Sequence, residues 1–253
     1  MTRHIVFANR KGGCAKTTTA VNVAHSLALK NYRVLLMDLD PQAHATLSLG
    51  MVPNPGVPNI YTLLDGGANL EDVIYPSRIA NLSIIPSSRN LSVVEIEGPC
   101  FSADEHRLSE VLHSKKMDMD YVIMDPPPSV GTLSVNALAA SEEVYIPMPM
   151  HFLAMEGLAE MVRLIYQINA AWNPGLSLGG IIPTFYNKNT RITKEIEGDI
   201  VQTFGEKFLA PPIRQNVALA EAPGHGLTIF EYAPKSIGAL DYDALASFID
   251  ERH

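Results

Sequence analysis

Short apolar runs alternate with longer amphipathic stretches along this chain. The run Ile5-Val6-Phe7-Ala8 predicts a strand over residues 4–9, and apolar residues at helical spacing predict a helix over residues 16–30. Continuous apolar runs are typical of parallel strands that are buried on both faces. The other strands are expected at residues 33–40, 82–86, 121–125, 144–150 and 179–185. The other helices are expected at residues 61–64, 70–74, 87–115 with a break near Gly98 and Pro99, 131–140, 154–171, 190–204 and 236–249.

This alternation predicts an α/β fold with a mostly parallel, twisted sheet that is flanked by helices. The 253 residues suffice for one large and well-buried core. No internal repeat, low-complexity stretch or linker divides the sequence. We therefore expect a single domain over residues 1–253.

Composition and charge narrow the class of protein. Hydrophobic residues make up 47% of the chain, yet no run reaches the roughly 18 apolar residues that span a bilayer. The sequence enters a strand at once, so we expect no signal peptide and no membrane partner. Two cysteines, Cys14 and Cys100, are too few for a disulfide framework and fit a reducing cytoplasm. The formal net charge of −8 excludes a protein that is basic all over, so nucleic-acid binding would need a local patch.

The segment between the first strand and the first helix is the strongest candidate for chemistry. A tight turn here, rich in glycine, would point backbone N–H groups and the positive end of a helix at one spot, which suits phosphate. Lys16 is expected to reach the β- and γ-phosphates, and the Thr17 hydroxyl is expected to hold magnesium. An ordinary turn is the alternative, although strand, Gly-Gly, Lys-Thr-Thr and helix in this order are a much rarer combination.

Three aspartates follow predicted strands. Asp38 and Asp40 lie two residues apart, so their side chains would point the same way if the strand continues. One of them could help to hold magnesium through water, and the other could orient an attacking water. Asp125 ends a later strand and is followed by three prolines that stop the ladder, an arrangement that predicts a further magnesium contact. The alternatives are a helix cap for the pair and a strand-end aspartate without a metal for Asp125.

The motifs resemble those of a known family. The strict pattern G-x-x-x-x-G-K-[ST] fails, because its glycines fall on Arg10 and Ala15, but the variant K-G-G-x-G-K-T-T matches except at Ala15. A left-handed backbone would make the Ala15 methyl group costly. D-x-D-P-Q at residues 38–42, three prolines after Asp125 and Glu-Ala-Pro at residues 221–223 follow in family order. Over nearly its whole length the chain resembles the ParA/MinD class of deviant Walker-A ATPases, and within that class the ParA/Soj partition ATPases.

The resemblance implies a P-loop NTPase that binds ATP and Mg²⁺ and hydrolyses ATP slowly without a partner. It implies catalytic roles for Lys11, Lys16 and Asp40, with Lys11 reaching the phosphates of a second subunit. The implied metal-site residues are Thr17, Asp38 and Asp125. The implied nucleotide-binding residues are Gly12, Gly13, Cys14, Ala15, Lys16, Thr17, Thr18, Asn187 and Pro212.

The implied function is that of a switch that dimerises with ATP and partitions DNA or positions a cargo. The expected partners are a second copy of the chain, non-specific DNA and a stimulating ParB-like protein, with a cytoplasmic and nucleoid-associated location. Where relatives carry arginines, this chain has Gln215, Ala218 and Asn189, so a DNA-binding patch would use other residues. The tentative DNA-binding residues are Lys188, Arg191, Lys194, Arg214 and Lys235, with Lys207 nearby in the sequence.

Other functions on the same fold stay open. A MinD-like membrane switch would need a basic amphipathic C-terminal helix, whereas the sequence ends with mixed charges after Ser247. A ligase or synthetase would need a substrate pocket that the sequence does not announce. An ATPase that positions a protein cargo instead of DNA is the third alternative. An iron–sulfur reductase is disfavoured, because Cys100 lacks a glycine-rich context and a second cysteine.

Overall fold

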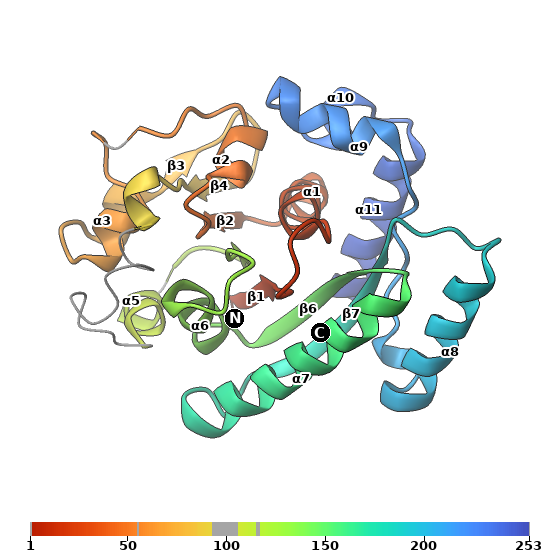
Figure 1. Cartoon of the computed structure of the whole chain (residues 1–253). Coiled ribbons are helices and arrows are strands. Elements are labelled where there is room, and N and C mark those ends of the chain that lie inside the picture. Colours follow the sequence, from red (N-terminus) through yellow and green to blue (C-terminus); the bar gives the residue numbers. More distant parts are fainter. Residues whose placement is uncertain (1, 55, 93–105, 115–116, 253) are drawn as a thin grey trace.

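A seven-stranded sheet forms the centre of the structure (Figure 1), in the order β3-β4-β2-β5-β1-β6-β7. This computed structural model describes residues 2–54, 56–92, 106–114 and 117–252. Every pairing is parallel except the one between β3 and β4, so the predicted mostly parallel sheet is confirmed. The strands are β1 (Arg3–Phe7), β2 (Val34–Asp38), β3 (Tyr75–Pro76), β4 (Leu82–Ile85), β5 (Tyr121–Asp125), β6 (Glu143–Pro149) and β7 (Ser177–Thr184).

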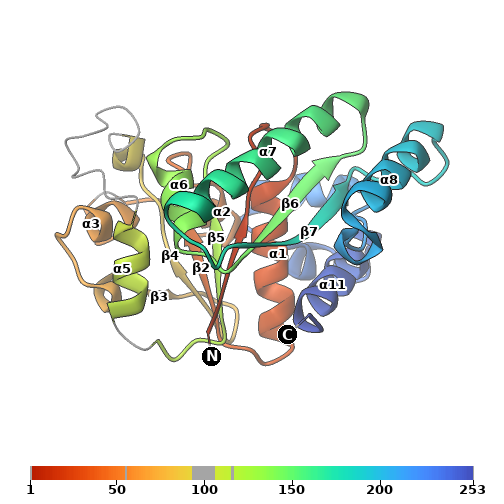
Figure 2. The same cartoon turned by 90° about the horizontal axis from the view of Figure 1, so that it is seen from below.

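Helices cover both faces of the sheet, because alternate strand residues face opposite sides. In β1 and just after it, Val6 and Ala8 belong to one buried cluster, whereas Ile5 and Phe7 belong to the other. Figure 1 shows α5, α6 and α7 on the first face and α1 and α11 on the second, and Figure 2 shows the same layers from below. The helices are α1 (Lys16–Leu29), α2 (His44–Ser48), α3 (Ile60–Leu64), α5 (Arg107–Ser114), α6 (Thr132–Ala139), α7 (Phe152–Ala171), α8 (Arg191–Phe204), α9 (Val217–Glu221), α10 (Ile229–Tyr232) and α11 (Ile237–Asp250). Short 3-10 turns are η1 (Leu70–Val73), η2 (Arg89–Leu91), η4 (Glu206–Phe208) and η5 (Ala222–His225).

The predicted strands and long helices are present, with small shifts at their ends. Strand β1 ends at Phe7 instead of residue 9, because the chain turns there into the loop before α1. The helix expected over residues 87–115 is present only as η2 and α5 in the described part, and Gly98, Pro99 and Cys100 lie outside the described residues. The sequence did not predict β3, α2, α9 or α10, each of which has five residues or fewer.

The sheet topology brings the candidate residues to one edge. Strand β1 lies between β5 and β6, so the chain order reverses at this point, and ligands of open α/β sheets bind beyond the carboxyl ends of strands at such a switch. The register of β2 and β5 pairs Asp38 with Asp125. The loops that follow β1, β2 and β5 therefore meet above the centre of the sheet.

No helix within the described ranges combines the length and the apolar character that crossing a membrane would require.

Candidate nucleotide site

The loop between β1 and α1 is fastened to two neighbouring strands. The Asn9 side chain donates through Nδ2 to the carbonyl oxygen of Pro147 at 2.7 Å, and its Oδ1 accepts from the Lys11 N–H at 3.0 Å. The Thr184 hydroxyl at the end of β7 donates to the Cys14 carbonyl oxygen at 3.3 Å. These bonds fix the loop to β6 and β7, so its backbone is held in place before any ligand binds.

Helix α1 begins after an N-cap residue whose side chain cannot cap the helix. Ala15 is the N-cap residue in a left-handed conformation, with φ 70° and ψ 28°, and it offers no side-chain hydrogen bond. Its carbonyl oxygen accepts from the Thr19 N–H at 2.9 Å and from the Thr19 hydroxyl at 2.7 Å. Because the first N–H groups of a helix lack internal partners and carry its positive end, the start of α1 favours an anion.

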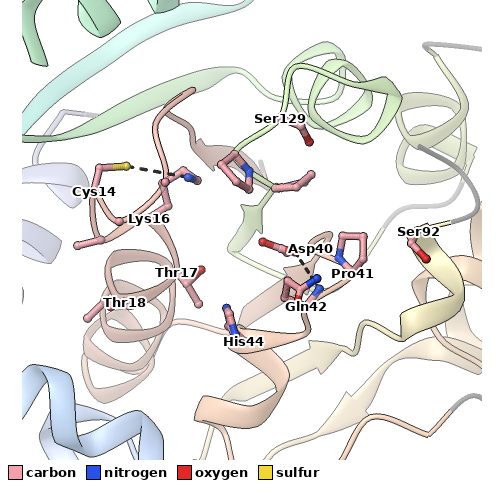
Figure 3. A pocket seen from close by; sticks show the side chains of 15 residues that line it. Cys14, Lys16, Thr17, Thr18, Asp40, Pro41, Gln42, His44, Ser92 and Ser129 are labelled. Carbon is pink, nitrogen blue, oxygen red and sulfur yellow. Dashed lines mark hydrogen bonds between the residues drawn. The ribbon is translucent and has the colours of Figure 1, made fainter. Parts of the chain in front are cut away.

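A cavity of about 630 Å³ opens beside this helix start (Figure 3). All the predicted loop residues from Gly12 to Thr18 line it, and so does Asp40. The sequence did not single out the other lining residues, although several belong to its motifs: they are Pro41, Gln42, His44, Ser92, Pro127, Pro128 and Ser129. Gln42 and the prolines were within reach of sequence reasoning, whereas nothing in the sequence marked His44 or Ser92.

Two lysines of the loop lie in different places. Lys16 is buried, and its Nζ donates to the Lys11 carbonyl oxygen at 3.2 Å and lies 4.0 Å from the Cys14 sulfur. Burial raises the pKa of the Cys14 thiol, so this cysteine is a neutral wall of the cavity. Lys11 instead runs along the start of α7, where its Nζ donates to the Leu153 carbonyl oxygen. A Cβ atom on Gly157 would lie 3.1 Å from Lys11 Cε, so the glycine makes room for this path.

Asp38 holds the segment that follows β2. One of its carboxylate oxygens accepts from the Asp40 N–H at 3.2 Å. The other accepts from the Thr46 N–H at 2.7 Å and from the Thr46 hydroxyl at 2.6 Å. Burial raises the pKa of Asp38 to about 7 despite these hydrogen bonds. Asp38 therefore anchors α2, and its part in a metal site stays a prediction.

The Asp125 side chain at the end of β5 is fully buried. Neither of its carboxylate oxygens has a well-formed hydrogen bond within the described part of the chain. Burial and the neighbouring Asp38 raise the pKa of Asp125 well above its ordinary value, and the nearby Thr17 hydroxyl only partly opposes that shift. Hard cations take oxygen ligands, so these residues fit magnesium.

The described residues do not form a metal site made of protein ligands alone. Among the described residues, no group of three or more His, Cys, Asp or Glu could hold a metal. Magnesium at nucleotide sites usually keeps waters and is bound by one or two carboxylates together with the substrate phosphates. Asp125 and Thr17 suit that type of site better than a closed coordination shell.

Asp40 lies past the end of β2 and faces the phosphate loop across the cavity (Figure 3). Its Oδ1 accepts from the Gln42 N–H at 2.8 Å, and its carbonyl oxygen accepts from the Ser87 hydroxyl at 2.6 Å. Because both the backbone and the carboxylate are fixed, Asp40 presents an acceptor in a defined place on the cavity wall.

A second cavity of about 400 Å³ adjoins the first and shares Gly13, Ala15 and Thr18 with it. Asn187 and Pro212, which were expected at the nucleobase, do not belong to its described lining; Asn187 instead accepts from the Asn189 N–H at 3.0 Å in its own turn. Base contacts by these two residues stay a prediction. The other lining residues are Thr184, Phe185, Ile213, Arg214, Gln215, Asn216, Val217, Leu219, Ala220 and Tyr242.

The basic residues expected at DNA are exposed, but two of them are paired. The Arg214 guanidinium forms a fork with Asp241, with N···O distances of 2.5–3.1 Å, and this pairing raises the Arg214 pKa. Arg191 pairs with Glu195 one turn along α8 at 2.7 Å. Lys188 and Lys194 are exposed near Arg191, so part of the expected patch is present as positive surface. Contact of these residues with DNA stays a prediction.

Comparisons with known proteins agree with this geometry. A family profile described as an AAA domain matches residues 2–178. The chain is 40% identical over 252 residues to the chromosome-partitioning ATPase Soj of Thermus thermophilus. This alignment covers 99% of this chain and 96% of that protein. It is 36% identical to the Soj protein of Treponema pallidum, over 100% of this chain and 98% of that protein. The fold is also similar to a solved structure of cobyrinic acid a,c-diamide synthase from Mycobacterium smegmatis with bound ATP analogue and magnesium. The TM-score is 0.85 and the sequence identity is 31%, over 98% of this chain and 93% of that one.

Ala15→Gly should stabilise the nucleotide-free protein. A left-handed conformation is unfavourable for a residue with a Cβ atom and free for glycine, so we expect a gain of about 1 kcal/mol in the free energy of unfolding. Chemical denaturation without nucleotide measures it. Ala159→Gly, at an exposed position inside α7, is the matched control and should lose about 0.5–1 kcal/mol. Equal losses in both variants would show that Ala15 is not strained.

Asp125→Asn should change how stability depends on pH. The folded pKa of Asp38 is raised to about 7, and that of Asp125 is raised well above its ordinary value. The contribution of the two groups to stability is therefore full below the ordinary aspartate pKa and is lost as pH rises through their folded pKa values. Without nucleotide or magnesium, Asp125→Asn should therefore be more stable than the unaltered protein at pH 8 by at least ~1 kcal/mol. The gain should shrink near pH 4.

Denaturation at both pH values measures this change in stability. The control is Asp199→Asn, which alters an exposed carboxylate on α8 and should leave the pH profile unchanged. A gain from Asp125→Asn that is equal at both pH values would contradict the burial of an ionisable carboxylate at this position.

Proposed function

The chain belongs to the ParA/Soj family of partition ATPases, and we propose that it is a switch in which two ATP-bound copies close on each other. The observation that carries the proposal is the arrangement of the two loop lysines. Lys16 lies in the wall of its own phosphate cavity, whereas Lys11 lies outside it along α7. A lysine of the loop that leaves its own cavity is placed to serve the cavity of a second copy.

The phosphates of ATP would lie against the N–H groups at the start of α1, beside Lys16. Thr17 and Asp125 would hold Mg²⁺, directly or through water, with Asp38 next to them. The metal ion supplies positive charge that neutralises the phosphates and polarises the transferred group. Its binding would also remove the energetic cost of an unpaired carboxylate at Asp125, which supports a metal at this place.

The chain's own residues divide the work of hydrolysis. Asp40, fixed by the Gln42 N–H, is the group we assign to orient the attacking water. Lys11 of the facing copy would stabilise charge on the transferred phosphoryl group, as an arginine finger does. Closure of two copies would then be required for turnover, so a partner protein that changes the closed state, such as a ParB-like protein, could set the rate.

DNA is the scaffold that we propose for the closed form. Lys188, Arg191 and Lys194 gather at the start of α8, where the positive end of the helix adds to their charge. Lysines and arginines at a helix start suit phosphate oxygens and read no base sequence. Arg214 is a weaker candidate, because Asp241 already pairs with its guanidinium. A chain of net charge −8 needs such a local patch to bind DNA in the nucleoid.

Two competing functions have distinct signatures. A ligase like the solved synthase would turn over ATP only when a metabolite is added, whereas a switch hydrolyses ATP without one. A membrane switch would need an amphipathic helix with an unpartnered apolar face. The apolar face of α11, with Tyr242, Leu245 and Ile249, is instead buried in the same cluster as α1. We therefore place the membrane alternative below DNA or a protein cargo.

Lys11→Ala should keep ATP binding and lose hydrolysis. If the lysine acts like an arginine finger, turnover should fall by about 10³-fold or more, because its charge is needed in the transition state. Phosphate release measures turnover, and calorimetry with a non-hydrolysable ATP analogue measures binding. Lys30→Ala, which removes a lysine paired with Asp243 at the far end of α1, is the control. Normal turnover in Lys11→Ala would disprove the role of Lys11 across the dimer.

Asp40→Ala, which traps the ATP state, should bind duplex DNA of any sequence with ATP and not with ADP. Adding Lys188→Ala and Lys194→Ala should weaken binding and reduce the slope of log K against log salt by about 2, because two phosphate contacts are lost. Fluorescence anisotropy at two salt concentrations measures both effects. The control pair is Lys30→Ala with Arg163→Ala, which removes equal charge elsewhere. Absence of DNA binding with ATP bound would point to a protein cargo instead.

A further inference from the structure

We propose that Arg78 is a positioning residue for ATP hydrolysis, which acts by holding the segment that carries Asp40. The inference rests on the proposed function, since it takes Asp40 as the group that orients the attacking water. Arg78 lies in the connection between β3 and β4, outside every motif of the nucleotide site. Its guanidinium joins the end of α2 to the segment around η5 and α10.

The Arg78 guanidinium holds three groups from separate segments. Its Nε and Nη2 form a two-pronged ion pair with the Glu231 carboxylate, at 2.6 and 2.7 Å. Nη2 also donates to the Gly226 carbonyl oxygen at 2.7 Å, and Nη1 donates to the Leu49 carbonyl oxygen. A guanidinium is planar and presents its donors in fixed directions, so these three acceptors are held in one defined arrangement.

Two glycines let the ends of α2 and η5 meet beside this side chain. Gly50 follows α2 with a φ of 71°, and Gly226 follows η5 with a φ of 65°. A Cβ atom on Gly226 would lie 2.9 Å from the Gly50 Cα, and one on Gly50 would lie 2.7 Å from the Arg78 Nη1. Side chains at these positions would therefore push the two backbones and Arg78 apart. Both glycines are needed for space as well as for conformation.

Helix α2 connects this junction to the hydrolytic residue. The helix has five residues, so Leu49 at its end and Thr46 within it belong to one short block. The Thr46 hydroxyl oxygen accepts from the Ser87 N–H at 3.0 Å. The Ser87 hydroxyl in turn donates to the Asp40 carbonyl oxygen at 2.6 Å. A shift at the Arg78 end of α2 is therefore passed to Asp40 through a short chain of hydrogen bonds.

The other side of the junction is anchored to helix α1. Glu231 caps α10 by accepting from the Thr228 N–H at 3.0 Å, and the Thr228 hydroxyl lies 2.6 Å from the His25 Nδ1 of α1. Helix α1 begins at the phosphate cavity. Arg78 therefore sets the place of α2, and with it Asp40, relative to the helix whose start faces the phosphates.

Loss of Arg78 should slow hydrolysis and spare ATP binding. Misplacement of a reacting group by about 1 Å can cost about 10²-fold in rate, so we expect turnover in Arg78→Ala to fall between about tenfold and about a hundredfold. The phosphate loop is fastened through Asn9 and Thr184 instead. The dissociation constant of a non-hydrolysable ATP analogue should therefore stay within about twofold of that of the unaltered protein.

The test measures phosphate release at saturating ATP and magnesium, together with calorimetry of the ATP analogue. Arg78→Gly leaves a place that solvent can reach, because the arginine side chain is partly exposed. Adding ethylguanidinium at millimolar concentration should restore most of the turnover that Arg78→Gly loses, which a general loss of folding would not allow. Arg78→Lys keeps the positive charge without the planar fork, so it should stay slow.

A double-mutant cycle tests whether Arg78 acts through Asp40. Adding Arg78→Ala to Asp40→Ala should lower the residual turnover by no more than about twofold, because the group to be positioned is already absent. The matched control is Arg33→Ala, which removes a similarly exposed arginine that also pairs with carboxylates, those of Asp118 and Asp120. Arg33→Ala should leave turnover unchanged.

Unchanged turnover in Arg78→Ala would overturn the inference, and so would an equal loss of ATP-analogue binding. Failure of ethylguanidinium to restore turnover, or losses that add in full in the double variant, would overturn it as well. If the unaltered protein binds and hydrolyses no ATP, the proposed function fails together with it. If the unaltered protein hydrolyses ATP and Arg78→Ala does so at the same rate, only the role of Arg78 fails.

Discussion

The carboxyl groups of Asp38 and Asp125 are fully buried side by side at the ends of adjacent strands. The rest of the site depends on the groups that neutralise or bind these two carboxylates. Asp38 is satisfied by Thr46 and the Asp40 N–H, and these bonds set the position of α2 and of the Asp40 loop. Within the described ranges, neither oxygen of Asp125 has a well-formed hydrogen bond of this kind. A buried carboxylate is stable only when it is neutral, paired or bound to a cation, so nucleotide-free protein carries a destabilised centre that a metal with its phosphates would relieve.

Backbone strain is concentrated around the same centre. Ala15 and Ala43 are both left-handed N-cap residues, at the starts of the two helices that border the phosphate cavity, and Phe185 borders the adjoining one. Each lies in a loop whose neighbours are fixed by hydrogen bonds to strands. The site is therefore rigid before ligand binds, which suits a switch whose response is a meeting of two copies instead of a rearrangement within one.

The sequence predicted the strands, the long helices and the phosphate loop. Continuous apolar runs indicate buried strands, apolar residues at helical spacing indicate helices, and paired glycines between a strand and a helix indicate the loop. The motifs of the sequence assigned Lys16, Asp40 and Asp125 to one nucleotide site, and the structure places Lys16 and Asp40 in the wall of the same cavity. The sequence missed α2 and α9, which are too short to show a period, and the antiparallel β3, which has two residues. Three features of the site depend on contacts that the local sequence does not show. They are the hydrogen bond from Thr46 to Asp38, the ion pair of Arg214 with Asp241 and the left-handed backbone of Phe185. No local pattern encodes them.

The most direct test of the switch is the mass in solution of Asp40→Ala, measured by light scattering behind a sizing column with magnesium and ATP, with ADP, and without nucleotide. The account predicts twice the mass of one chain with ATP and the mass of one chain in the other two conditions. A single-chain mass with ATP, in protein shown by calorimetry to have ATP bound, would contradict the closing of two copies around nucleotide.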